Sequence, residues 1–240
     1  MRNLLSSLAI GTVLLSSCYK QSDFEPLSED LDNVIVVLRA TPEDLPANGT
    51  STSTIIAQLP DDGIVGVDIS FRTSRGVFTE SNSNSCTVKS KVAVLDGVTR
   101  VFATATLRST QTTGTATVTA QLAEYEKQCT VNIGTNAPTA LSLSVPTLVM
   151  QDTATSELEI TAQLTSTNGP VTIGQTVDLE VMDPAMNPRG SFRLEEDQSN
   201  ADGKCRFVFS IMPDTAYTGP LVIRGSTAGI GVTLQDSLTI

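Results

Sequence analysis

Adjacent carboxylates are the side chains in this sequence whose spacing suits acid–base chemistry. Asp61-Asp62 and Glu195-Glu196 are two such pairs, and paired carboxylates cleave glycosidic bonds in many hydrolases. Both pairs lie beside turn residues, where we expect no apolar or aromatic cleft to raise a carboxyl pKa. The chain also has no His, which removes Ser-His-Asp and Cys-His catalysis. We therefore predict that the protein is not an enzyme.

The acidic loop 195–203 contains oxygen ligands of the kind that Ca²⁺ prefers. Its spacing does not fit the D-x-[DN]-x-[DN]-G frame, and no bidentate Glu follows at the right distance. We expect a hairpin turn with solvated charges, and neither a metal nor another cofactor. Nucleotide binding has no support, because no glycine-rich loop follows a strand and opens a helix. The net charge of -11 argues against a nucleic-acid partner, since polyanions bind through Lys and Arg.

Residues 1–17 have the features of a signal peptide: Arg2 gives a positive start, and a short apolar run reaches Leu15. That run is shorter than the ~20 apolar residues of a transmembrane helix. Leu15-Ser16-Ser17-Cys18 resembles the bacterial lipobox. The resemblance implies that Cys18 is diacylglycerated, that the signal is cut before it, and that the new N-terminus is acylated, commonly with palmitate. We expect the lipid on Cys18 to anchor the chain in the bacterial cell envelope, at the outer membrane.

Residues 18–32 follow as the lipidated Cys and an acidic stretch without apolar periodicity, so we expect a solvated tether. Lys20 and Gln21 ahead of Asp23 resemble the export signal of Bacteroidetes surface lipoproteins. The resemblance favours display at the cell surface, with a periplasmic orientation left open.

From residue 33 onward, short runs rich in Val, Ile and Thr alternate with polar residues and stop at Gly, Pro, Asn or Asp. This pattern predicts an all-β chain built as antiparallel sandwiches. Inward positions are expected in several runs: Val34, Val36, Leu38; Val65, Val67, Ile69, Phe71; Val101, Ala103, Ala105, Leu107; Ala116, Val118, Ala120, Leu122; Cys129, Val131, Ile133.

The pattern repeats, because Ile56-Ala57-Gln58-Leu59 recurs as Thr161-Ala162-Gln163-Leu164 and Val67-Asp68-Ile69 recurs as Val177-Asp178-Leu179. Internal repeats of this length indicate tandem domains. We place domain 1 at 33–135 and domain 2 at 138–240. The linker between them is short, which predicts that the domains stack end to end.

Domain 1 resembles the bacterial Ig-like repeats of the invasin/intimin type. The residues that carry the resemblance are Leu45 to Ser51, Gly66 to Thr73, Gly76-Val77-Phe78, Asp96-Gly97 and Gly114 to Ala120. Domain 2 keeps the strand plan but lacks a Gly-x-Phe after its third strand. The resemblance implies Ig-like folds that serve as extracellular spacers and adhesion modules.

Three cysteines remain after Cys18. Cys86 has the parity of Val88, Val92 and Val94, and Cys129 has that of Val131 and Ile133, so both are expected to point inward, where a disulfide between them is possible. Strand direction argues against that bridge, because the two strand starts lie at opposite ends of a sandwich. Cys205 shares parity with Phe207, Phe209 and Ile211, and we expect a buried free thiol.

The sequence thus favours a non-enzymatic, lipid-anchored envelope protein that presents Ig-like modules for adhesion or protein–protein contact. The loop carrying Met182, Pro184, Met186 and Pro188 is the predicted contact loop, because loops on a rigid sandwich often carry function. Two alternatives stay open. One is a structural or accessory subunit of an envelope complex. The other is a surface carbohydrate-binding module, for which Tyr125 and Tyr217 are the candidate platforms, so the partner is an unidentified protein or glycan.

Overall fold

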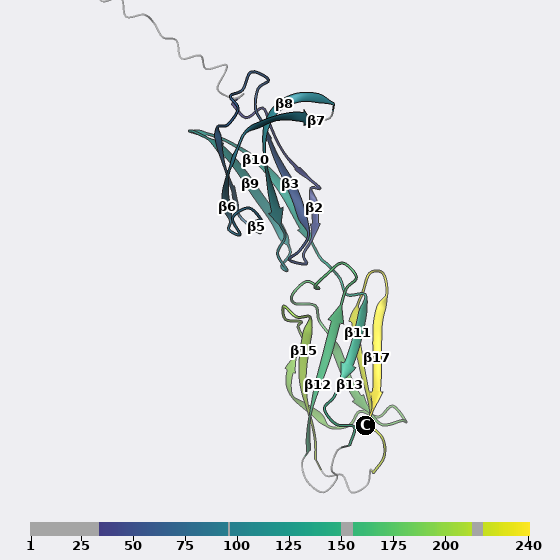
Figure 1. Cartoon of the computed structure of the whole chain (residues 1–240). Helices are drawn as coiled ribbons and strands as arrows, with labels where there is room; N and C mark the ends of the chain where they lie inside the picture. The colour runs from purple at the N-terminus through teal and green to yellow at the C-terminus, as the bar shows by residue number, and fades with distance from the viewer. Residues whose placement is uncertain (1–33, 96, 150–155, 213–217) are drawn as a thin grey trace, which may run out of the picture.

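The computed structural model describes residues 34–95, 97–149, 156–212 and 218–240 (Figure 1). The predicted signal peptide, Cys18 and the tether lie outside these ranges. The described chain is all-β, as the sequence predicts, and no sheet contains described strands from both sides of the segment 135–139. Within the same ranges, no helical segment has the length and hydropathy that crossing a membrane requires.

Domain 1 is a sandwich of two five-stranded sheets. The first contains β1 (Val37–Thr41), β3 (Thr52–Gln58), β8 (Val98–Arg108) and β5 (Val77–Phe78) in that order, with β7 (Lys91–Leu95) paired to β8. The second runs β2 (Asp44–Pro46), β10 (Tyr125–Gly134), β9 (Gly114–Leu122), β4 (Asp68–Thr73), β6 (Ser85–Lys89). The pairs are antiparallel except that β2 runs parallel to β10.

Domain 2 is a sandwich of a four-stranded and a three-stranded sheet. The larger sheet runs β11 (Ala140–Ser144), β12 (Ser156–Thr165), β15 (Lys204–Ile211), β14 (Ser191–Glu196). The smaller sheet runs β13 (Asp178–Met182), β16 (Val222–Ala228), β17 (Thr233–Thr239). The two sheets are also tied along an edge, where the Leu143 N–H donates to Asp236 Oδ2 at 2.7 Å.

Each domain has its own apolar core, formed by the alternate residues that face the opposite sheet. The inward positions predicted for β8, β9 and the end of β10 are confirmed, with Ala103, Ala116 and Val131 all fully buried. The repeated segments occupy matching positions, since the shared Ala-Gln-Leu run is buried at Ala57 in β3 and Leu59 just after it, and at Ala162 and Leu164 in β12.

The inward assignment is wrong for Val65, Val92 and Val94, which are 54%, 51% and 68% exposed. Val65 precedes β4 and lies in a loop. At Ser90 the chain passes from β6 in one sheet to β7 in the other, so the parity that starts at Cys86 does not carry across. The hairpin of β7 and β8 then extends beyond the neighbouring strands, as the upper part of Figure 1 shows.

Candidate functional site

The predicted contact loop is a compact turn organised around Asp183, which connects β13 to β14. The Asp183 side chain is 5% exposed. Its Oδ1 accepts the backbone N–H groups of Ala185 and Asn187, both at 2.9 Å, and its Oδ2 accepts Arg189 Nη2 at 2.9 Å. The Asn187 side-chain amide donates to both carboxylate oxygens. One carboxylate therefore fixes the backbone of the whole loop.

These donors lower the pKa of Asp183 to about 2. The side-chain hydrogen bond from Asn187 contributes most, followed by its backbone N–H, while burial of the carboxyl opposes them. Hydrogen bonds to the charged form stabilise it, so Asp183 is ionised at neutral pH. An acid that is ionised and fully hydrogen-bonded serves to hold the loop and is unsuited to general acid catalysis.

The loop exposes Pro184, Met186 and Pro188, whereas Met182 is only 5% exposed. The inclusion of Met182 in the contact set is therefore wrong: its backbone bridges Pro188 and its side chain is buried. Met186 has a φ of 66° and is 56% exposed, which places it at the apex.

Two cations beside the loop were not predicted from the sequence. Arg224 Nη2 lies 3.9 Å from Met186 Sδ, and the guanidinium of Arg189 supports the loop from below through Asp183. Arg224 comes from β16, which pairs with β13, and only that pairing brings it to the loop. For Arg189, its position six residues after Asp183 was the one feature of the sequence that could have indicated its contact with the loop.

The contact loop lies at the end of domain 2 that faces away from domain 1. It follows the last residue of β13, whereas the segment 166–175 that precedes β13 contacts domain 1. There Thr172 Oγ1 donates to the carbonyl of Ala47 at 3.1 Å and accepts the backbone N–H of Asn136 at 2.7 Å. Because β13 spans the sandwich, its two ends lie at opposite ends of the domain.

Gln111, which follows β8 in domain 1, makes a second interdomain contact at this joint. Its Nε2 donates to the carbonyl of Ala201 at 2.8 Å, and its own carbonyl accepts the N–H of Ile173 at 2.9 Å. Two loops of domain 2 are thereby bound to a single residue of domain 1.

Asn48 completes the joint and is 2% exposed. Its Oδ1 accepts the N–H of Ser51 at 2.8 Å, and its Nδ2 donates to the carbonyl of Asn168 in domain 2. Gly169 comes close enough that an added Cβ would lie 3.1 Å from Thr50 Oγ1, at a φ of +92°. The domains stack end to end, as the short linker predicts (Figure 1).

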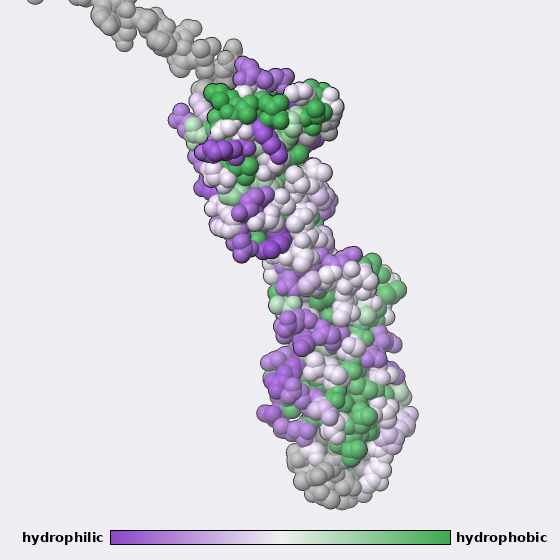
Figure 2. Space-filling model, in the orientation of Figure 1, coloured by the Kyte–Doolittle hydropathy of each residue, from purple (hydrophilic) through white to green (hydrophobic). Residues whose placement is uncertain are grey.

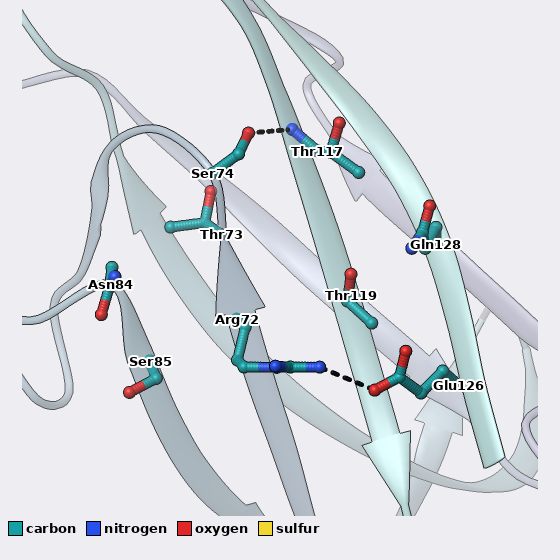
Figure 3. Close-up of a pocket in the computed structure, with 9 residues that line it drawn as sticks. All are labelled: Arg72, Thr73, Ser74, Asn84, Ser85, Thr117, Thr119, Glu126 and Gln128. Atoms are coloured by element: carbon teal, nitrogen blue, oxygen red, sulfur yellow. Dashed lines mark hydrogen bonds and ion pairs between the residues drawn. The ribbon is translucent and has the colours of Figure 1, made fainter.

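A shallow polar hollow of about 440 Å³ lies on the outer face of the β4–β9–β10 sheet (Figure 3). Figure 3 shows Arg72 reaching across Thr119 to Glu126, with 2.6 Å between Nη2 and Oε1. Both partners of this ion pair are more than one-third exposed, so the pair contributes little stability. The hollow is lined by hydroxyl, amide and charged side chains, which suits hydrogen bonding to water or a polar ligand.

The other candidate residues predicted from the sequence lie apart from one another. Cys86, Cys129 and Cys205 are free thiols. A Cys86–Cys129 disulfide is ruled out by the sheet order, because β6 and β10 belong to one sheet with β4 and β9 between them. Three strand spacings of ~4.8 Å exceed what a disulfide can bridge. Tyr125 is half-buried at the start of β10, and Tyr217 lies outside the described residues. Among those residues no cluster of Cys, Asp and Glu could hold a metal ion.

The comparisons with known proteins point to a fold. No protein-family model matches the chain, and no curated protein matches its sequence. Among solved structures, invasin, described as a bacterial integrin-binding protein, matches 85% of this chain with a TM-score of 0.59 and 19% identity. The adhesin InvE of Yersinia pseudotuberculosis matches 85% at 19% identity and a TM-score of 0.47. Bovine butyrophilin matches 85% at 12% identity and a TM-score of 0.38.

The chain spans 39% of the invasin structure and 58% of InvE, less than two thirds of each. At these identities the similarity to invasin concerns the arrangement of strands and not a binding surface. The expectation drawn from the residues of domain 1 is confirmed at that level. The chain therefore has the tandem Ig-like fold that invasin also contains.

Proposed function

We propose that the chain is a non-enzymatic, lipid-anchored protein of the bacterial cell envelope whose two Ig-like domains hold a protein-contact surface away from the membrane. The proposal rests on two features of the Asp183-centred loop: where it lies, and the fixed conformation that Asp183 gives it. It lies at the end of domain 2 opposite the joint, whereas the lipid would be attached beyond the N-terminal end of domain 1. The joint hydrogen bonds keep these two ends apart.

The chemistry of the loop suits a protein partner. Met186 offers a polarizable, adaptable apolar side chain, and Arg224 adds a cation beside it at 3.9 Å. Met and Arg are enriched in protein–protein interfaces. The loop is ordered before binding because Asp183 holds its backbone, so little conformational entropy is lost on contact. Invasin, whose fold this chain shares, is an integrin-binding protein, which supports an adhesive role for a surface of this kind.

The test is adhesion by intact cells that express the full chain. Cells with wild-type protein are compared with cells carrying Met186→Glu for attachment to cultured cells and to extracellular matrix proteins. We expect attachment to fall several-fold, because the charge disrupts the apolar apex. The matched control is Ile230→Glu, since Ile230 is also exposed, at 68%, but lies in the β16–β17 turn at the joint end of domain 2.

Equal losses for both variants, or none, would contradict the contact-loop proposal. Recovery of the chain in a stable complex with other envelope proteins, unaffected by Met186→Glu, would favour the accessory-subunit alternative. Binding to immobilised glycans that depends on Tyr125 would favour the carbohydrate-binding module.

A further inference from the structure

Five large apolar side chains are exposed together at the N-terminal end of domain 1. We define this apolar tip by its residues and their exposed fractions: Ile64 72%, Val65 54%, Val92 51%, Val94 68% and Val98 48%. Figure 2 shows hydrophobic surface at the end of domain 1 where the N-terminal chain enters. Large apolar side chains gathered in this way on a soluble domain mark a contact surface.

The tip is built by ordered backbone. Ser90 Oγ donates to the carbonyl of Ile64 at 2.8 Å and accepts the N–H of Val67 at 3.1 Å. The Ser90 carbonyl accepts the N–H of Gly66 at 2.9 Å. One serine at the crossover between the sheets therefore fixes the loop that presents Ile64 and Val65.

Exposed valines lie on both faces of the hairpin half of the tip. Val92 and Val94 share one face of β7, and Val98, which pairs with Leu95, lies on the other face together with the cations Lys91 and Arg100. A protein partner would cover one face of such a finger and leave the other in water. A fluid apolar medium surrounds both faces, so this geometry favours the interface of a lipid bilayer as the occupant.

The attachment point of the chain lies at this same end. Val37, the first residue of β1, pairs with Gln58 at the end of β3, and Lys127 Nζ binds the carbonyls of Ile35 and Val36 at 3.1 and 2.7 Å. The β7–β8 hairpin begins where β3 ends, since Phe102 pairs with both Gln58 and Lys91. The tip and the point where the chain enters domain 1 are therefore neighbours.

The chain between Cys18 and the described structure is short. Residues 19–33 reach at most ~50 Å when extended and ~20 Å as a flexible coil. A tether of that length keeps the bilayer at a high effective concentration at the tip. Two of the acidic residues beside the tip face cations, Asp68 with Lys89 at 3.0 Å and Asp61 with Arg100 at 3.9 Å, and Lys91 adds a further cation.

We infer that the apolar tip of domain 1 inserts into the interface of the bilayer that holds the lipid on Cys18, so that the two-domain rod stands on the membrane. The inference rests on the proposed lipid anchor. It goes beyond that anchor because it assigns a second membrane contact to Ile64, Val65 and the β7–β8 hairpin.

The chain has no Trp, which makes Val94→Trp a unique fluorescent reporter. The lipidated full chain carrying Val94→Trp is reconstituted into vesicles of phosphatidylethanolamine and phosphatidylglycerol, with and without brominated phosphatidylcholine. We expect the Trp emission of the protein in vesicles to lie at a shorter wavelength than that of protein freed of lipid in detergent-free buffer. We also expect the emission to be lost in the brominated vesicles. Met186→Trp, exposed at the far end of the rod, is the matched control and should show neither change.

A third variant tests whether the Trp itself drives insertion. Adding Val92→Thr and Val98→Thr to Val94→Trp keeps β-branched residues in the hairpin but removes apolar surface, and bromine quenching should fall markedly. Unchanged quenching would overturn the assignment of Val92 and Val98 to the membrane contact.

Flotation separates the failure of the anchor from the failure of the tip. If the protein floats with vesicles but Val94→Trp stays unquenched, the anchor stands and the tip inference is overturned. If lipidated protein does not float, the anchor fails and the inference fails with it. A wavelength shift that requires high protein concentration and shows no bromine quenching would assign the tip to a second copy of the chain and overturn the bilayer contact.

Discussion

The side-chain amide of Gln111 in domain 1 donates a 2.8 Å hydrogen bond to the main-chain carbonyl of Ala201 in domain 2. Its backbone carbonyl at the same time accepts the N–H of Ile173 at 2.9 Å. One residue therefore binds two separate loops of the other domain. Such a contact resists both bending and twisting about the linker, as the proposed spacer role requires.

Gln111→Ala should loosen the joint without unfolding either domain. The variant loses the interdomain hydrogen bonds of the Gln111 side chain, to the carbonyls of Ala201 at 2.8 Å and Val171 at 3.5 Å, each worth at most about 0.5–1.5 kcal/mol net, while each core remains complete. Small-angle scattering should show a broader distribution of interdomain distances. Gln128→Ala, an exposed change on the outer face of β10, is the control and should scatter like the wild type. Identical scattering from both variants would mean that the joint does not depend on Gln111.

Asn48→Ala should have a larger effect, because Asn48 is buried and bonds within domain 1 as well as across the joint. Leaving its buried partners unsatisfied costs about 1–3 kcal/mol. Thermal unfolding should show a lower midpoint for domain 1, and the scattering should broaden as for Gln111→Ala. A broadened distribution with no loss of stability would assign Asn48 to the joint alone.

The contact loop should depend on pH through Asp183. Its pKa falls from an ordinary 3.8 to about 2 in the folded protein, so the charged form stabilises the loop. That stabilisation is complete above the ordinary pKa and is lost as the pH falls through about 2. The protection factors of the Ala185 and Asn187 amides, which compare the measured exchange rate with that of an unstructured peptide at the same pH, should fall over that range.

Asp183→Asn should remove the pH dependence of these protection factors and accelerate exchange at neutral pH, because its amide NH₂ would face donors. Asp178→Asn, at the exposed opposite end of β13, is the matched control. Slow exchange in Asp183→Asn at neutral pH would show that the carboxylate does not hold the loop.

The fold was largely predictable because alternation along a strand reports directly which residues face the core. Cys205, Phe207 and Phe209 illustrate this, since their shared parity predicted burial and they are 1%, 2% and 0% exposed. The prediction of inward positions failed where the chain passes from one sheet to the other between β6 and β7. Val92 and Val94 keep the parity of Cys86 but lie in β7, in a different sheet from β6.

The contact loop was predictable as a loop but not as a structure. Its Met and Pro residues mark it in the sequence, whereas the role of Asp183 depends on donors that converge from Asn187 and Arg189. Arg224 comes from a strand of distant sequence, and no local pattern reports that pairing. The joint was harder still, because Gln111 and Asn48 resemble ordinary turn residues until the domains are placed together.

Cys205 should be inert to maleimide in the folded protein. Burial raises the pKa of its thiol to about 11, with Asp197 adding a smaller effect, and the thiolate is the reactive form. Cys205→Ser should lower the stability of domain 2 by about 1 kcal/mol, since an unpartnered hydroxyl costs ~1–3 kcal/mol and the Asp197 carbonyl, 3.4 Å from the sulfur, offsets part of it. Such a loss corresponds to about 4–8 °C in melting temperature.

Peptide mapping after labelling provides the measurement, with Ser142→Cys as an exposed control on β11. The control should label rapidly in native buffer, and Cys205 only after denaturation. Rapid native labelling of Cys205 would contradict the register of β15.

In the proposed arrangement, the lipid on Cys18 gives the two-domain chain its orientation and sets the distance of the contact loop from the membrane. The most direct measurement is metabolic labelling with an alkyne fatty acid, followed by membrane fractionation of cells expressing the wild type or Cys18→Ala. We expect the wild type to be labelled, processed and found in the membrane fraction, and Cys18→Ala to be unlabelled and either released or left unprocessed. A Cys18→Ala protein that is correctly processed and still membrane-bound would contradict the lipid anchor.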